Sequence, residues 1–167
     1  MIPSRRLVLA GAVALLAAPA GRAAVEPVEI VMQGRGGGSH VWFDPVGLLV
    51  RPGQTVRWTN REAGNVHTAT AYHPSNLDHP LRIPGAALPW DSDYLMPGES
   101  FAVELTEPGV YDYFCIPHEH AGMVGRIVVG GPGPDDGVRP DGDLPDVALR
   151  AFPPVEAILR KGMVRQS

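Results

Sequence analysis

The chain has 167 residues, of which 44% are hydrophobic, so it can form one packed domain with additional segments. Charged residues make up 19% and form no run of one sign, which excludes the basic patch typical of nucleic-acid-binding proteins. The 20 glycines and 18 prolines predict many turns and short elements. Cys115 is the only cysteine, so an intrachain disulfide is excluded; the residue is a buried apolar side chain, a reactive thiol or a metal ligand.

Residues 1–23 are predicted to be a cleavable export signal. Arg5 and Arg6 form a basic start, an apolar run follows at 7–18, and small residues allow cleavage after residue 20 or 23. The apolar run has 12 residues, which is shorter than the ~20 residues that a membrane-spanning helix needs. We therefore favour a removable signal over the alternative, an uncleaved membrane anchor.

The basic start also indicates the export route. The segment Ser4-Arg5-Arg6-Leu7-Val8-Leu9 resembles a twin-arginine signal, and the general export pathway is the alternative. Removal of residues 1–23 takes away three arginines and no acidic residue, so the formal net charge changes from −4 to −7. The mature protein is predicted to be periplasmic and moderately acidic, without stable membrane insertion after signal cleavage.

The segment 25–130 has the pattern of short strands. Runs of β-branched and aromatic residues alternate with turn residues, and within Gln54–Asn60 the side chains of Val56 and Trp58 share one face. We therefore predict an all-β fold, a Greek-key β-sandwich, over this segment. Its extended segments are expected at 28–32, 41–43, 46–50, 54–60, 67–72, 99–106, 110–115 and 124–129.

Two regions depart from this plan. Residues 73–96 form a long, proline-rich inserted loop, which is usually functional in a compact domain. Its His73 and His79 leave a second metal site open, although no spacing rule selects them. Residues 131–167 are predicted to be a Gly/Pro/Asp linker followed by a short helical C-terminal tail, with helices at 146–152 and 154–161.

Four residues form a candidate metal centre. Cys115, His118 and Met123 follow the pattern Cys-x2-His-x4-Met in one short loop, and His67 belongs to an extended region some fifty residues earlier in the chain. A thiolate, two imidazoles and a weak thioether are the ligands of a blue-copper electron-transfer site. His120 is the alternative to His118, but Met123 would then follow it too closely.

Four segments resemble the cupredoxins, the blue-copper family, most closely plastocyanin and pseudoazurin. The resemblance implies one type 1 copper ion, with His67, Cys115, His118 and Met123 as its ligands. It also implies that Thr68, the residue after the first histidine, supports the cysteine sulfur. The segments are Phe43-x-Pro45, Pro52-Gly53-Gln54-Thr55-Val56-x-Trp58-x-Asn60, Asn65-Val66-His67-Thr68, and Gly109-Val110-Tyr111-x-Tyr113-x-Cys115 continuing through Met123-Val124-Gly125.

The function implied by this resemblance is that of an exported carrier of single electrons. It would accept an electron from one redox protein and donate it to another by outer-sphere transfer, and no nucleic acid is expected as a partner. A copper-binding or copper-delivery protein without a redox partner is the first alternative. A small copper oxidoreductase is the second, and it would need a further copper site with an open position.

We also predict where electrons cross the surface. His118 would present a ring edge to solvent, within an apolar patch formed by Pro117, Ala121, Gly122 and Met123. The inserted loop is expected to extend this patch, so that Trp90 or Ile83 lies near the loop 115–123.

Overall fold

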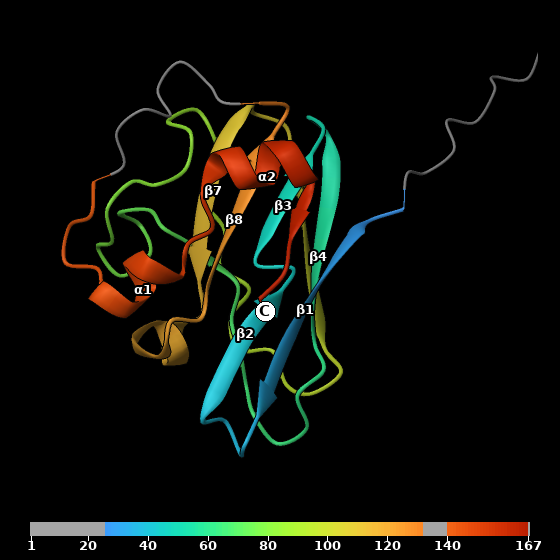
Figure 1. The fold of residues 1–167 in the computed structure, drawn as a ribbon, viewed down its shortest axis with the longest axis vertical. Helices are drawn as coiled ribbons and strands as arrows, with labels where there is room; N and C mark the ends of the chain where they lie inside the picture. Colours follow the sequence, from blue (N-terminus) through green and yellow to red (C-terminus); the bar gives the residue numbers. More distant parts are fainter. Residues whose placement is uncertain (1–25, 132–139, 167) are drawn as a thin grey trace, which may run out of the picture.

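The computed structural model describes residues 26–131 and 140–166. The predicted signal and most of the linker lie outside the described residues. Two sheets pack face to face (Figure 1), which confirms the all-β sandwich. The first has the strand order β2-β1-β4-β6 and the second β5-β7-β8-β3-β9. The strands are β1 (Val28–Arg35), β2 (His40–Asp44), β3 (Gly47–Val50), β4 (Gln54–Asn60), β5 (Thr70–Ala71), β6 (Ser100–Leu105), β7 (Gly109–Phe114), β8 (Val124–Val129) and β9 (Met163–Val164).

The core lies between the sheets, as the alternating pattern predicts. Val56 and Trp58 on β4 are fully buried, whereas Arg57 between them is exposed. The Trp58 ring packs edge-on against Tyr113 of the opposite sheet, with ring centroids 5.3 Å apart. Strand pairs β1–β4 and β3–β8 are parallel and join segments distant in sequence, which requires crossover connections between the sheets.

The extended segment predicted at 67–72 forms only the short strand β5. Its remaining partners come from the inserted loop, through isolated bridges that pair His67 with Leu95 and Thr70 with Asp91. The backbone N–H of Leu95 donates to the carbonyl of His67 at 2.8 Å. The edge beside β5 is therefore completed by the loop, and periodicity could not reveal this because the loop has no strand pattern of its own.

The inserted loop contributes to the core instead of extending an apolar surface. Ile83 and Trp90 are buried, and the Trp90 ring lies 5.7 Å from Trp58 and 6.0 Å from Tyr111. Because both side chains are buried, the expectation that they extend the surface patch beside the loop 115–123 is wrong. They pack into the sandwich because the edge beside β5 leaves apolar surface of β4 and β7 to be covered.

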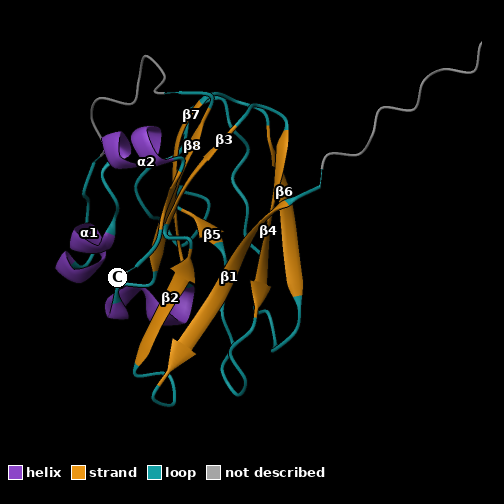
Figure 2. Cartoon of the chain, turned by 45° about the vertical axis from the view of Figure 1, so that its right-hand side comes forward, coloured by secondary structure: helices purple, strands orange, loops and turns teal. Residues whose placement is uncertain are grey.

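The C-terminal tail is helical, as predicted, and it docks on the sandwich. Helices α1 (Asp146–Ala151) and α2 (Val155–Lys161) lie on the same side of the sandwich as the 3-10 helix η1 (Ile116–Ala121; Figure 2). Ala148 and Ile158 are fully buried, and β9 pairs with β3 after α2. None of the described helices is long and apolar enough to span a bilayer.

A buried carboxylate ties the inserted loop and the tail to the sandwich. Asp112 on β7 is fully buried and accepts hydrogen bonds from Arg82 of the loop and Arg126 of β8, at 2.7–3.0 Å. Arg82 also donates to the carbonyl of Pro140, and Arg126 donates to that of Pro153. Because each charged group has several partners, the network can be buried without an unpaired charge.

Candidate metal centre

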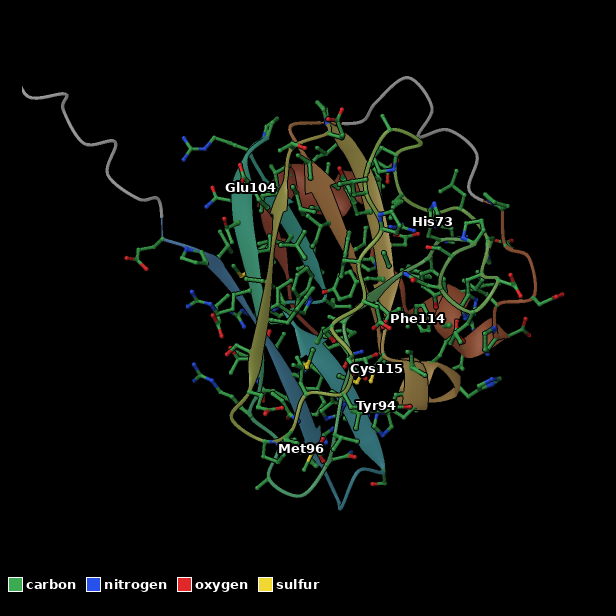
Figure 3. The ribbon with its side chains drawn as sticks, turned by 180° about the vertical axis from the view of Figure 1, so that it is seen from behind. His73, Tyr94, Met96, Glu104, Phe114 and Cys115 are labelled. Atoms are coloured by element: carbon green, nitrogen blue, oxygen red, sulfur yellow. The ribbon has the colours of Figure 1, made fainter. Side chains whose placement is uncertain are left out.

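The structure brings three of the four predicted residues to one point at an end of the sandwich. Cys115 follows β7, His118 lies in η1, and His67 precedes β5. The Cys115 Sγ lies 3.6 Å from Nδ1 of His67 and 3.3 Å from Nδ1 of His118. Figure 3 shows Cys115 beside the ribbon of η1, in the half of the sandwich away from Glu104. Both imidazoles therefore present the same nitrogen to the sulfur.

Backbone hydrogen bonds hold the loop that carries Cys115, His118 and Met123. The Cys115 N–H donates to the carbonyl of Met123 at 3.0 Å, and the Met123 N–H donates to that of His118 at 3.1 Å. Met123, the fourth predicted residue, is fully buried. Gly122 ends η1 with φ of 80°, a left-handed conformation that favours glycine. The 3-10 helix was not predicted, because a six-residue element gives no periodicity signal.

The donor atoms fit a metal ion. Nitrogen and sulfur ligands lie about 2.0–2.3 Å from a bound ion, so two ligands at a wide angle are roughly 3.5 Å apart. The two sulfur–nitrogen distances, 3.6 Å and 3.3 Å, agree with this spacing. One thiolate and two imidazoles, with a buried thioether in the same loop, form the donor set of a type 1 copper site.

The sulfur is buried and receives a backbone hydrogen bond from Thr68. The Thr68 N–H lies 3.3 Å from Cys115 Sγ, at the position expected to support the sulfur. The Thr68 hydroxyl accepts from the N–H of Ile116 at 2.8 Å, which ties the two segments together. Burial raises the pKa of Cys115 to about 12, and hydrogen bonds from Thr68 and from the His118 backbone only partly oppose this. Binding of a metal ion as thiolate must therefore release a proton.

The pKa values of both imidazoles are lowered. Burial lowers the pKa of His67, and a hydrogen bond to Glu62 opposes the effect without overcoming it. Burial, and then the proximity of His67, lower the pKa of His118. A neutral imidazole keeps a lone pair for a metal ion, so the electrostatics of the site favour metal binding without prior loss of protons from the rings.

The family follows from comparison with known proteins. The family described as copper binding proteins, plastocyanin/azurin family, matches residues 29–130. The chain belongs to this family. It is therefore a cupredoxin, and its cofactor is one type 1 copper ion.

Individual cupredoxins agree with this assignment. Plastocyanin from Oryza sativa subsp. indica is 37% identical over 125 residues, which cover 72% of this chain and 75% of the relative. Plastocyanin from Tetradesmus obliquus is 39% identical over 88 residues, but these cover 52% of this chain and 57% of that protein. The structure of a pseudoazurin from Sinorhizobium is similar with a TM-score of 0.57 and 26% identity, and the match covers 83% of this chain and 99% of that one.

The other candidate histidines of this cupredoxin lie apart from the cluster. His120 is exposed and is absent from the group formed by His67, Cys115 and His118. His73 bonds through Nδ1 to the Ser75 hydroxyl at 2.8 Å. The described residues bring no second group of three such side chains together.

His79 contacts the metal-site loop from outside. Its Nε2 lies 3.7 Å from the carboxylate of Glu119, and its ring packs on Phe114 with centroids 4.6 Å apart. Glu119 is buried and also accepts a hydrogen bond from the Tyr72 hydroxyl at 2.6 Å. His79 therefore packs against the loop from outside and is not one of the candidate ligands.

The surface around His118 is smaller than predicted. His118 is partly exposed, and Pro117 and Ala121 are exposed beside it. Gly122 and Met123 are buried, which corrects their assignment to the surface patch. A Cβ added at Gly122 would lie 3.2 Å from Val147 of α1, because the tail helix covers this part of the loop.

Sequence reasoning missed two residues that contact the site. Glu62 is buried, and its Oε2 lies 2.7 Å from Nε2 of His67. Leu95 of the inserted loop pairs with His67 through an isolated β-bridge. Neither residue stands at a spacing that indicates metal chemistry, so only the tertiary structure reveals them.

Proposed function

We propose that this cupredoxin is an exported type 1 copper protein that carries one electron at a time between redox partners by outer-sphere transfer. Copper is held by His67, Cys115, His118 and Met123. The observation that carries the proposal is the cluster of one sulfur and two imidazole nitrogens, whose donor atoms all lie within 4.8 Å of one another. This donor set suits both Cu(I) and Cu(II), so the electron moves with little change in coordination.

The position of the cluster supports electron transfer by brief contact. Cys115 and His67 are fully buried, whereas the His118 ring is partly exposed with Pro117 and Ala121 beside it. The ring offers the shortest path between a partner and the metal. Weak electron-transfer encounters use small interfaces, and this patch is suited to one.

Export and the redox partners belong to the same proposal. The signal-like segment 1–23 supports transport to the periplasm by the twin-arginine route. The partners would be one protein that donates an electron and one that accepts it. Loss of the signal leaves a net charge of −7 by sequence, so attraction to a partner with a basic surface would accelerate their encounter at low ionic strength.

The first experiment is copper loading of the protein without residues 1–23. We expect Cu(II) to produce an intense visible absorption from thiolate-to-copper charge transfer. Cys115→Ser should abolish this absorption, since an alcohol oxygen does not replace the thiolate donor. His120→Ala is the matched control, and it should leave the spectrum unchanged. A colourless wild-type protein would overturn the proposal.

A second measurement separates the carrier from its alternatives. A carrier should show a reversible one-electron wave in voltammetry and keep its copper when it is reduced in the presence of a Cu(I) chelator. A delivery protein would lose Cu(I) to the chelator. An oxidase would consume oxygen when a reductant is supplied, and this would require an additional open metal site.

A further inference from the structure

A carboxylate lies directly behind one of the two imidazoles. Glu62, just after β4, is 9% exposed, and its Oε2 is 2.7 Å from Nε2 of His67. Burial of a carboxylate is costly unless strong hydrogen bonds compensate for lost water. Asn65 provides a longer second contact to the same oxygen, at 3.4 Å, and the Glu62 N–H donates to the Asn60 side chain at 2.9 Å.

The contact determines which nitrogen of His67 carries the proton. Because a carboxylate accepts hydrogen bonds, Nε2 must be the protonated nitrogen of the neutral ring. Nδ1 then keeps its lone pair, and it is Nδ1 that lies 3.6 Å from Cys115 Sγ. A carboxylate behind a metal-bound histidine fixes the ring and strengthens it as a donor.

The two imidazoles differ in this respect. The Nε2 of His118 lies 3.5 Å from the side-chain nitrogen of Asn65. If Nδ1 of His118 binds a metal ion, its Nε2 is protonated, and the two nitrogens are both donors that cannot bond to each other. The anionic acceptor therefore acts on His67 alone.

Gly34 on β1 provides the space for this carboxylate. A Cβ added at Gly34 would overlap the Glu62 carboxyl group. Gly34 lies within the ladder opposite Val41 of β2, at a position where its φ is ordinary for any residue. The absence of a side chain there is needed for the carboxylate and not for the backbone conformation.

We propose that the Glu62 carboxylate is a positioning residue that holds His67 in its metal-binding tautomer and lowers the reduction potential of the copper ion. The inference rests on the proposed function, because it takes His67 as a copper ligand. A buried negative charge near the metal favours Cu(II), the more positive state, over Cu(I). A stronger imidazole donor acts in the same direction.

The decisive variant is Glu62→Gln, which keeps the size and one acceptor oxygen but removes the charge. We expect the charge-transfer absorption to persist. The equilibrium constant for reduction of Cu(II) to Cu(I) should rise about tenfold, which raises the reduction potential by about 59 mV for one electron. Glu104→Gln is the matched control, because it makes the same charge change in the part of the sandwich away from Cys115 (Figure 3). Its potential should stay close to that of the wild type.

A second variant moves the carboxylate without changing the charge. Gly34→Ala should displace Glu62 from His67 and raise the potential in the same direction as Glu62→Gln. If both variants keep the wild-type potential while their absorption persists, the inference is wrong and the proposed function stands. If the wild-type protein shows no charge-transfer absorption, the proposed function itself has failed.

A measurement without metal keeps the inference testable if the variants lose copper or do not fold. Nitrogen-15 NMR of the metal-free wild-type protein should show His67 as the tautomer protonated at Nε2. The tautomer protonated at Nδ1 would overturn the inference, since that nitrogen must be free for the metal ion.

Discussion

Replacement of Gly122 by alanine tests how the metal-site loop and the tail depend on each other. Gly122 ends η1 with φ of 80°, and its N–H donates to the carbonyl of Glu119 at 2.8 Å. An added Cβ would lie 3.2 Å from Cγ2 of Val147 and 3.7 Å from Cβ of Ala151, both on α1. The substitution therefore combines backbone strain with a tight contact against the tail.

The two costs can be estimated separately. A residue with a Cβ in the left-handed region costs about 1–2 kcal/mol. The contact with Val147 is closer than most carbon contacts, and overpacking of this kind adds about 1 kcal/mol. We expect Gly122→Ala to lower the free energy of unfolding by about 2–3 kcal/mol.

A double-mutant cycle with Val147→Ala distinguishes the two contributions. Truncation of Val147 removes the close contact but leaves the backbone conformation of Gly122 unchanged. In that background, Gly122→Ala should cost only about 1–2 kcal/mol, so the coupling energy is about 1 kcal/mol. Val147→Ala alone should have a small effect because Val147 is 37% exposed.

The assay is urea unfolding of the metal-free protein, so that copper affinity does not enter the measured free energy. Tryptophan fluorescence is a suitable signal because Trp58 and Trp90 are buried. A cost below about 0.5 kcal/mol for Gly122→Ala would refute the argument from backbone strain. An equal cost in both backgrounds would show that α1 does not press on the loop.

Three further predictions follow from the buried groups. The free energy of unfolding of the metal-free protein should fall as the pH rises from 9.0 towards about 12, because the Cys115 thiol ionises in the unfolded chain and stays protonated in the folded one. Urea titrations at several pH values measure this dependence, and Cys115→Ser should weaken it. Asp112→Asn should cost about 3–5 kcal/mol of stability, since two buried guanidinium groups lose their anion, and an unchanged urea midpoint would contradict this. Met123→Leu should retain copper and raise the reduction potential whereas Met123→Gln should lower it, and equal potentials in voltammetry would show that Met123 does not approach the metal.

The sequence alone predicts the part of the metal site whose residues lie close together along the chain. Cys115, His118 and Met123 lie in one loop, so their pattern predicts a shared site without knowledge of the fold. The alternation in Gln54–Asn60 predicts β4 with its observed bounds, because one face of the strand is buried and the other is not.

The contacts that the sequence could not reveal join segments without regular patterns. Glu62 reaches His67 through a turn, and its burial depends on the space left at Gly34 of another strand. Trp90 is expected from the sequence to extend the apolar surface patch, because its segment has no evident core to join, yet it packs in the core beside Trp58. Such contacts are set by tertiary packing and leave no local signal.

The network at Asp112 has a consequence for engineering this protein. The inserted loop provides Arg82, and the tail provides the carbonyl of Pro153 that Arg126 uses. Deletion of either segment to obtain a smaller sandwich would remove hydrogen-bond partners from the charged groups in the interior. A smaller version of this protein would therefore need apolar replacements at Asp112 and at both arginines, introduced together with the deletion.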